Sequence, residues 1–172
     1  MVAGNKVKEL AIIAMLSAAS VAGRVVMTPI PGLQPTTVIV MVTTMGLGLR
    51  QGLLVVLIST LVSNLQLGHG VWTLFQLLAW SVVAVISYFY GKSRWSNYLI
   101  ISSVVAGFTG IIYGMIVSLN GLLFTKRIIA YYLAGLPHDI THAIGNFAIY
   151  FAIGGRLQRL LKSYSAAYFG RK

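Results

Sequence analysis

Six stretches of mainly apolar residues follow one another along the chain, and short groups of glycine, proline, polar or charged residues separate them. A membrane-spanning helix needs about 20 mostly apolar residues, and in lipid an open strand would leave its backbone N–H and C=O groups unbonded. We therefore predict an all-α integral membrane bundle of six transmembrane helices, in one domain covering residues 1–172. The predicted spans are residues 10–27, 36–49, 53–67, 74–90, 98–119 and 138–154.

The breaks on the predicted external side differ in character. Residues 29–35 contain three prolines, and proline cannot continue a helix because its nitrogen has no hydrogen to donate. Residues 63–73 instead concentrate polar groups, glycine and tryptophan. Residues 120–137 are less regular, and their apolar piece 128–136 is either an interfacial helix or the first turns of the last span.

Composition supports a membrane protein. Hydrophobic residues make up 58% of the chain and charged residues 9%, whereas soluble domains carry roughly 25% charged residues. The loops are too short to hold a separate soluble catalytic domain. The chain has no cysteine, which excludes disulfides and cysteine metal sites.

The basic residues predict an orientation. Lysine and arginine number 13 against 2 acidic residues, for a net charge of +11. Cytoplasmic segments of membrane proteins carry an excess of lysine and arginine, so the basic breaks and both termini are expected in the cytoplasm, with residues 126–127 outside. Contact with membrane lipid or nucleic acid is the alternative use of this charge, and we predict no nucleic-acid partner. The basic residues assigned to the cytoplasmic side are Lys6, Lys8, Arg50, Lys92, Arg94, Arg156, Arg159, Lys162, Arg171 and Lys172.

Small residues recur at every fourth position of the first span, at Ala14, Ala18 and Ala22. Residues at this spacing share one helix face, and a face with little side-chain bulk lets another helix approach closely. The strip serves either packing within the bundle or docking onto a second membrane protein.

Polar side chains and indoles gather at the predicted external ends of the spans. Neutral hydrogen-bonding groups beside indoles suit a heterocyclic, mostly uncharged ligand. No polar line continues below them towards the cytoplasm, so we expect a cup that opens outward and is closed inside. The predicted ligand-contacting residues are Arg24, Gln34, Asn64, His69, Trp72, Gln76, Trp80, Asp139, His142 and Asn146.

At some of these positions a structural role competes with ligand contact. Arginine inside a membrane is costly unless it is paired or hydrated, so an ion pair between Arg24 and Asp139 competes with direct ligand contact by one or both. The spacing of His138, Asp139 and His142, with His69 as a further ligand, is compatible with a metal, but it is a weak signal, and we predict no metal site. No serine combines a glycine elbow with an evident base, so we predict no enzyme activity.

Four local patterns are shared with one known family. Ala14-x-x-x-Ala18 is similar to its docking strip, while Arg24 and residues 29–35 look like its first helix end and gating loop. Residues 63–76 are similar to the Ser-Asn…Gly-x-Gly-x-Trp-Thr…Gln pattern of one branch, and residues 139–146 resemble its last-helix signature, Asp-Ile-x-His-Ala-x-Gly-Asn. The chain thus resembles the substrate-binding S component of energy-coupling factor (ECF) vitamin transporters, a class of ABC importer.

This resemblance implies a protein of the bacterial cytoplasmic membrane that binds a vitamin outside, topples in the membrane and releases it inside. Its implied partners are a transmembrane coupling subunit, which docks on Ala14, Ala18 and Ala22, and two ATPase subunits, which hydrolyse the ATP. Residues 29–35 and the segment after the third span would be the lids. No permanently bound cofactor is implied.

The branch pattern favours cobalamin as the transported ligand, and pantothenate, a queuosine precursor or another vitamin is the alternative. The branch often has Gly-Gln-Gly-Pro-Trp-Thr-Pro, where this chain has His69, Val71 and Leu74. His69 would either coordinate a corrinoid cobalt or make an ordinary polar contact. Functions of another class are a self-sufficient channel or facilitator, and a membrane scaffold.

Overall fold

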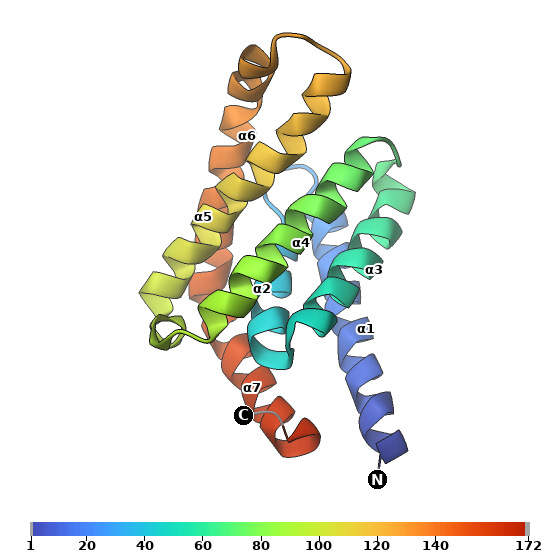
Figure 1. Ribbon diagram of the computed structural model, residues 1–172, viewed down its shortest axis with the longest axis vertical. Helices are drawn as coiled ribbons and strands as arrows, with labels where there is room; N and C mark the ends of the chain where they lie inside the picture. The colour runs from blue at the N-terminus through green and yellow to red at the C-terminus, as the bar shows by residue number, and fades with distance from the viewer. Residues whose placement is uncertain (1, 171–172) are drawn as a thin grey trace.

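The computed structural model describes residues 2–170, and within this range the chain is helical apart from short turns and loops (Figure 1). The all-α prediction is confirmed. Arg171 and Lys172, which the charge pattern assigned to the cytoplasmic side, lie outside the described residues. The α-helices are α1 (Val2–Val26), α2 (Thr36–Leu47), α3 (Leu49–Leu67), α4 (Trp72–Gly91), α5 (Leu99–Ser118), α6 (Ile128–Ile149) and α7 (Gly155–Phe169). Shorter helical turns are η1 (Arg94–Asn97), η2 (Leu119–Leu123) and the π-turn η3 (Tyr150–Gly154).

Four helical segments are long and apolar enough to cross a membrane: Asn5–Val26, Leu49–Leu67, Trp72–Gly91 and Leu99–Leu123. This fits a multi-pass membrane protein. Helix α2 has only 12 residues, so at about 1.5 Å per residue it is shorter than the hydrocarbon core of a bilayer. The assignment of α2 and α6 as further spans stays a prediction.

Helix α2 is the centre of the bundle, in contact with α1, α3, α4, α5 and α7 (Figure 1). Eleven of its 12 residues are buried. A helix that is apolar all round is stable only when other elements surround it. The β-branched run 38–42, which in water would suggest a strand, is therefore the core of a helical bundle.

Helices α5 and α6 pack closely because glycines of α5 face α6. A Cβ atom built on Gly107 would lie 3.1 Å from the Ala143 carbonyl oxygen, and one on Gly110 would lie 2.7 Å from Asn146 Nδ2. Small residues at a helix contact allow the backbones to approach. Helix α6 begins at Ile128 and runs through Pro137 without interruption. The apolar piece 128–136 is thus the first turns of this helix.

The chain after the last predicted span forms α7, which the apolar pattern did not predict. Its buried residues Gln158, Leu161 and Ser165 recur at i, i+3 and i+7 and face the bundle, while Arg156 and Arg159 are exposed. Lys8 Nζ lies 4.0 Å from the ring centroid of Tyr168, so both ends of the chain share one end of the bundle (Figure 1). The α2–α3 and α4–α5 turns lie at this end too, and the α5–α6 connection lies at the other.

Candidate ligand-binding site

A cavity of about 740 Å³ lies at the end of the bundle opposite to the chain termini. The proline-containing loop after α1 and the outer ends of α3, α4, α5 and α6 surround it. Its volume is within the range of about 300–1,000 Å³ typical of small-molecule sites. Five of the ten predicted site residues line it: Arg24, Gln34, Trp72, Gln76 and Asp139.

Arg24 makes three side-chain hydrogen bonds in this site. Its Nε donates to Gln34 Oε1 (3.0 Å), and its Nη1 donates to Ser63 Oγ (2.5 Å) and Asn64 Oδ1 (3.3 Å). The guanidinium carbon lies 4.9 Å from the ring centroid of Trp80, a distance typical of cation–π contact. Arg24 thereby joins α1, the proline loop, α3 and α4 in one network, although it is only 7% exposed.

Of the two alternatives for Arg24 and Asp139, the structure does not show the ion pair. Asp139 Oδ1 instead lies 3.6 Å from His138 Nδ1. Arg24 is satisfied instead by the neutral oxygens of Gln34, Ser63 and Asn64. A guanidinium has five N–H donors in one plane, and neutral oxygens around it can accept from several of them at once. Arg24 therefore does not need the Asp139 carboxylate as a hydrogen-bond acceptor.

Asn64 and Trp80 lie behind the cavity wall and support it, and their contact with a ligand stays a prediction. Asn64 is 1% exposed, and its Nδ2 donates to Thr73 Oγ1 (3.0 Å) and Gln76 Oε1 (2.8 Å). Trp80 is fully buried, and its indole N–H donates to Thr37 Oγ1 (3.0 Å). Both therefore position side chains that line the cavity.

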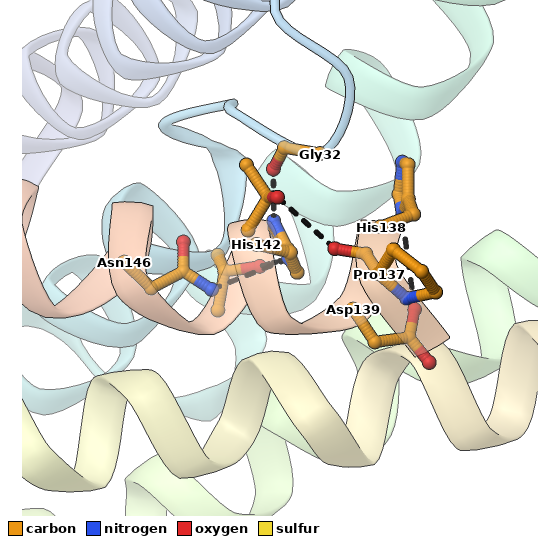
Figure 2. A network of polar contacts seen from close by, with 8 residues as sticks. Gly32, Pro137, His138, Asp139, His142 and Asn146 are labelled. Atoms are coloured by element: carbon orange, nitrogen blue, oxygen red, sulfur yellow. Dashed lines mark hydrogen bonds and ion pairs between the residues drawn. The ribbon is translucent and has the colours of Figure 1, made fainter. Parts of the chain in front are cut away.

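His142 ties the proline loop to the core, as Figure 2 shows. Its Nδ1 lies 2.7 Å from the Gly32 carbonyl oxygen, and its Nε2 lies 3.0 Å from Thr37 Oγ1. A carbonyl only accepts, so Nδ1 carries the hydrogen. Asn146 Nδ2 lies 3.2 Å from the same Nε2. An amide nitrogen only donates, so Nε2 accepts and the ring is neutral. His142 and Asn146 thus hold the loop and do not line the cavity, so their contact with a ligand stays a prediction.

Gly32 is required where the proline loop crosses α6. Its φ of +83° is in the left-handed region, and a Cβ atom there would lie 2.5 Å from the His138 carbonyl oxygen. Only glycine adopts this conformation at no steric cost. The loop can therefore lie directly on α6, with its carbonyl above His142.

Asp139 points away from His142, towards α5 (Figure 2). It is 5% exposed, and its Oδ2 is buried without a hydrogen-bond partner. Buried polar groups in native proteins almost always have a partner, so an exception of this kind points to a function or a bound group. Asp139 also lines the cavity, which makes its carboxylate a candidate for contact with a ligand.

Gly114 on α5 makes the space for this carboxylate. A Cβ atom on Gly114 would lie 2.1 Å from Asp139 Cγ. We expect Gly114→Ala to lower the free energy of unfolding by about 1–3 kcal/mol, as overpacking does, and to weaken ligand binding. The matched control is Gly135→Ala, in the same cavity wall, whose Cβ would meet only Ser118 Oγ at 3.9 Å.

The control should be neutral, or stabilising by up to about 1 kcal/mol, because alanine favours a helix. Thermal unfolding of the purified proteins measures both effects. In an Asp139→Ala background, the cost of Gly114→Ala should shrink, since the clashing group is gone. An equal cost in both backgrounds would contradict the assignment.

His69 does not take part in the cavity. It is exposed in the turn between α3 and α4 and does not line the cavity wall. The described part of the chain contains no group of three histidine, cysteine, aspartate or glutamate side chains that could hold a metal ion. His142 faces the loop while His138 contacts Asp139, so the residues considered as metal ligands point in different directions.

Two tyrosines of the cavity wall were not among the predicted site residues. Tyr113 on α5 is 3% exposed, and its ring centroid lies 4.6 Å from that of Trp80. A tyrosine in the middle of an apolar span was a usable signal, because its hydroxyl requires a partner. Tyr131 donates to Asn120 Oδ1 (3.0 Å). No signal identified it, since residues 120–137 had no assigned structure.

The small-residue strip lies outside the bundle. Ala14, Ala18 and Ala22 are all exposed, whereas Leu16 and Ser20 on the other face of α1 are buried. The strip therefore does not serve packing within this chain. Its face is open to lipid or to another protein.

Comparisons of the chain with protein families, with curated proteins and with solved structures found no significant match. The function of this chain is therefore inferred from the geometry of the cavity and the strip and from the sequence patterns.

Proposed function

We propose that this chain is the vitamin-binding S component of an ECF-type importer, with cobalamin as its ligand. The observation that carries the proposal is one bundle with two separate features: a polar cup at one end and an uncovered alanine strip along α1. A cup alone would suit many binding proteins. A cup combined with a face on which a second helix can approach closely suits a binding subunit that depends on a partner.

The side chains of the cup favour a ligand with several hydrogen-bond donors. Asp139 brings a carboxylate to the cavity wall, Gln34 and Gln76 are already oriented by Arg24 and Asn64, and Trp72 offers an indole at the rim. Amide groups around a corrinoid ring, or the ring nitrogens of a smaller heterocycle, match this set. A corrinoid exceeds the cavity in size and would extend through its mouth, whereas pantothenate or a queuosine precursor would be enclosed.

The proposal is tested by calorimetric titration of the purified protein with cobalamin, cobinamide, pantothenate and a queuosine precursor. We expect one ligand to bind with a Kd below about 1 μM, which corresponds to about −8 kcal/mol. Binding of a vitamin other than cobalamin would retain the S-component proposal and change its ligand. Binding of none would contradict the whole proposal.

Transport should require partners. In the proposed orientation both termini are cytoplasmic, and the ATPase subunits act through a coupling subunit at the alanine strip. Liposomes containing this chain alone should take up no vitamin, whereas addition of the coupling subunit, both ATPase subunits and ATP should start uptake. Uptake by the chain alone would instead make it a self-sufficient facilitator.

Replacement of Asp139 by asparagine tests its role as ligand acceptor. The amide keeps the shape of the side chain but removes its charge, so we expect ligand affinity to fall by about tenfold, or 1.4 kcal/mol. Calorimetry measures the affinity, and thermal unfolding shows whether the fold is retained. Thr141→Val is a suitable control, because Thr141 is half-buried on α6 and its hydroxyl bonds only within its helix, to the Pro137 carbonyl. Unchanged affinity in Asp139→Asn would return Asp139 to a structural role.

A further inference from the structure

A second cavity, of about 570 Å³, lies at the basic end of the bundle, remote from the cup. Three segments that are far apart in sequence form it: residues 44–48 at the end of α2, residues 88–92 at the end of α4, and residues 162–166 of α7. Neither the cup nor the alanine strip includes any of these residues. The proposed function therefore leaves this cavity unused.

The charged residues lining this cavity are both cations. Lys92 and Lys162 line it, and no acidic residue does. Lys162 Nζ contacts the neutral Asn97 Oδ1 at 3.4 Å, and Lys92 Nζ lies 4.0 Å from the ring centroid of Tyr88. Burial lowers the pKa of the Lys162 ammonium, because desolvation disfavours its charged form. A bound anion would offset this cost.

A third lining residue supplies an unused hydrogen-bonding group. Ser165 is 3% exposed, and its Oγ is buried with no hydrogen-bond partner. Helix α2 ends and α3 begins at Gly48, which also lines the cavity, so the opposite partial charges of these two helix ends largely cancel. The C-terminal end of α4 also borders the cavity and carries a partial negative charge. The full charges of the two lysines exceed it and set the sign of the site.

An apolar groove begins beside this site along the chain. Leu49, Leu53 and Leu57 line it with Leu54, and Arg50 is its one charged residue. Leu49 follows Gly48 directly, and the three leucines at i, i+4 and i+8 share one face of α3. Leu53 and Leu57 are exposed. A cationic cavity next to an apolar groove is complementary to an anionic phospholipid, which has a negatively charged phosphate next to an apolar acyl chain.

We propose that the cavity at the basic end binds the phosphate group of an anionic membrane lipid, with an acyl chain along the leucine groove of α3. Lysines supply the charge and Ser165 donates to a phosphate oxygen. Basic pockets between membrane helices are known to bind such headgroups. The lipid would connect α2, α4 and α7 at the end of the bundle where both termini lie.

Native mass spectrometry of the delipidated protein tests this proposal, with phosphatidylglycerol, phosphatidylcholine and inorganic phosphate as separate probes. We expect one phosphatidylglycerol to be retained per chain. The double variant Lys92→Gln/Lys162→Gln should bind it about 10- to 30-fold more weakly, given the usual contribution of each lysine. Ser165→Ala should weaken binding by a smaller factor. The matched control is Lys126→Gln/Arg127→Gln, which removes the same charge at the other end of the bundle.

Each alternative outcome overturns the proposal. If both double variants lost the same amount of affinity for phosphatidylglycerol, the lipid would be attracted by the net charge of the protein alone. If phosphatidylcholine were retained as well as phosphatidylglycerol, the cavity would not distinguish an anionic headgroup from a neutral one. Phosphate binding as tight as that of the lipid would make free phosphate the ligand. Loss of coupling-subunit assembly in Lys92→Gln/Lys162→Gln, with no lipid bound by the unmodified chain, would make the cavity a protein contact.

Discussion

Replacement of Arg24 by alanine is expected to lower ligand affinity by about a hundredfold or more, equivalent to about 2.7 kcal/mol. Arg24 donates to Gln34, Ser63 and Asn64 from a position that is 7% exposed. Its removal leaves these acceptors without a charged donor, and a hydrogen bond to a charged group contributes about 1.5–3 kcal/mol. Stability should therefore fall together with affinity.

The loss of affinity has a specific geometric cause. Gln34 belongs to the proline loop, and Asn64 orients Gln76, so Arg24 fixes two walls of the cavity at once. Arg24→Lys separates charge from shape, because lysine keeps the positive charge but lacks the planar fork that bonds several acceptors. We expect Arg24→Lys to recover part of the stability and little of the affinity.

Calorimetry and thermal unfolding on the same preparations distinguish these effects. Arg156→Ala, which removes an exposed arginine of α7 at the other end of the bundle, is the matched control and should change neither quantity. If Arg24→Ala bound ligand as tightly as the unmodified chain, the cavity around Arg24 would not be the binding site.

The second large effect is expected at Ala18 on the exposed strip of α1. Ala18→Trp should weaken association with a coupling subunit by about a hundredfold, equivalent to about 2.7 kcal/mol. Close helix contact in a membrane depends on small residues that let the two backbones approach, and an indole would hold them apart. Ligand affinity should be unchanged, because Ala18 is exposed and lies outside the cavity wall.

Co-purification of tagged coupling subunit with the variant measures this association, and calorimetry measures ligand affinity in parallel. Phe108→Trp is the control: Phe108 is 64% exposed on α5, so the same indole is placed on a different apolar face. Undiminished co-purification of Ala18→Trp would remove the strip from the proposed interface. Loss in both variants would indicate a general effect of an added indole.

The pattern of apolar residues predicted most of the helices of this protein, but not α7 and not the first ten residues of α6. The predicted span 36–49 begins where α2 begins, at Thr36, and the predicted spans 74–90 and 98–119 differ by two residues or fewer from the ends of α4 and α5. The reason is physical: in lipid, each backbone group must bond within its own helix. A helix can therefore end only where the chain leaves the lipid, and clusters of proline and glycine mark those places in the sequence. Helix α7 was not predicted because polar and apolar residues alternate along it, and it contains no long continuous apolar stretch.

Half of the predicted site residues line the cavity, but the role of each one could not be predicted. Spacing indicated that Asp139, His142 and Asn146 share one side of a helix, yet Asp139 faces the cavity and α5 while His142 bonds the loop carbonyl of Gly32. Such a division depends on which neighbours pack on either side of α6. Only the assembled bundle places Gly114 and Gly32 there.

The sequence by itself determined a basic, cysteine-free helical bundle with an alanine strip and a polar end, because solvent and backbone chemistry act on every residue locally. The tertiary structure decided that the strip is exposed, that α2 is the core and that Arg24 bonds neutral oxygens rather than Asp139. It also brought Lys92, Lys162 and Ser165 to one cavity. These facts depend on contacts between residues far apart in the chain, which no local pattern records.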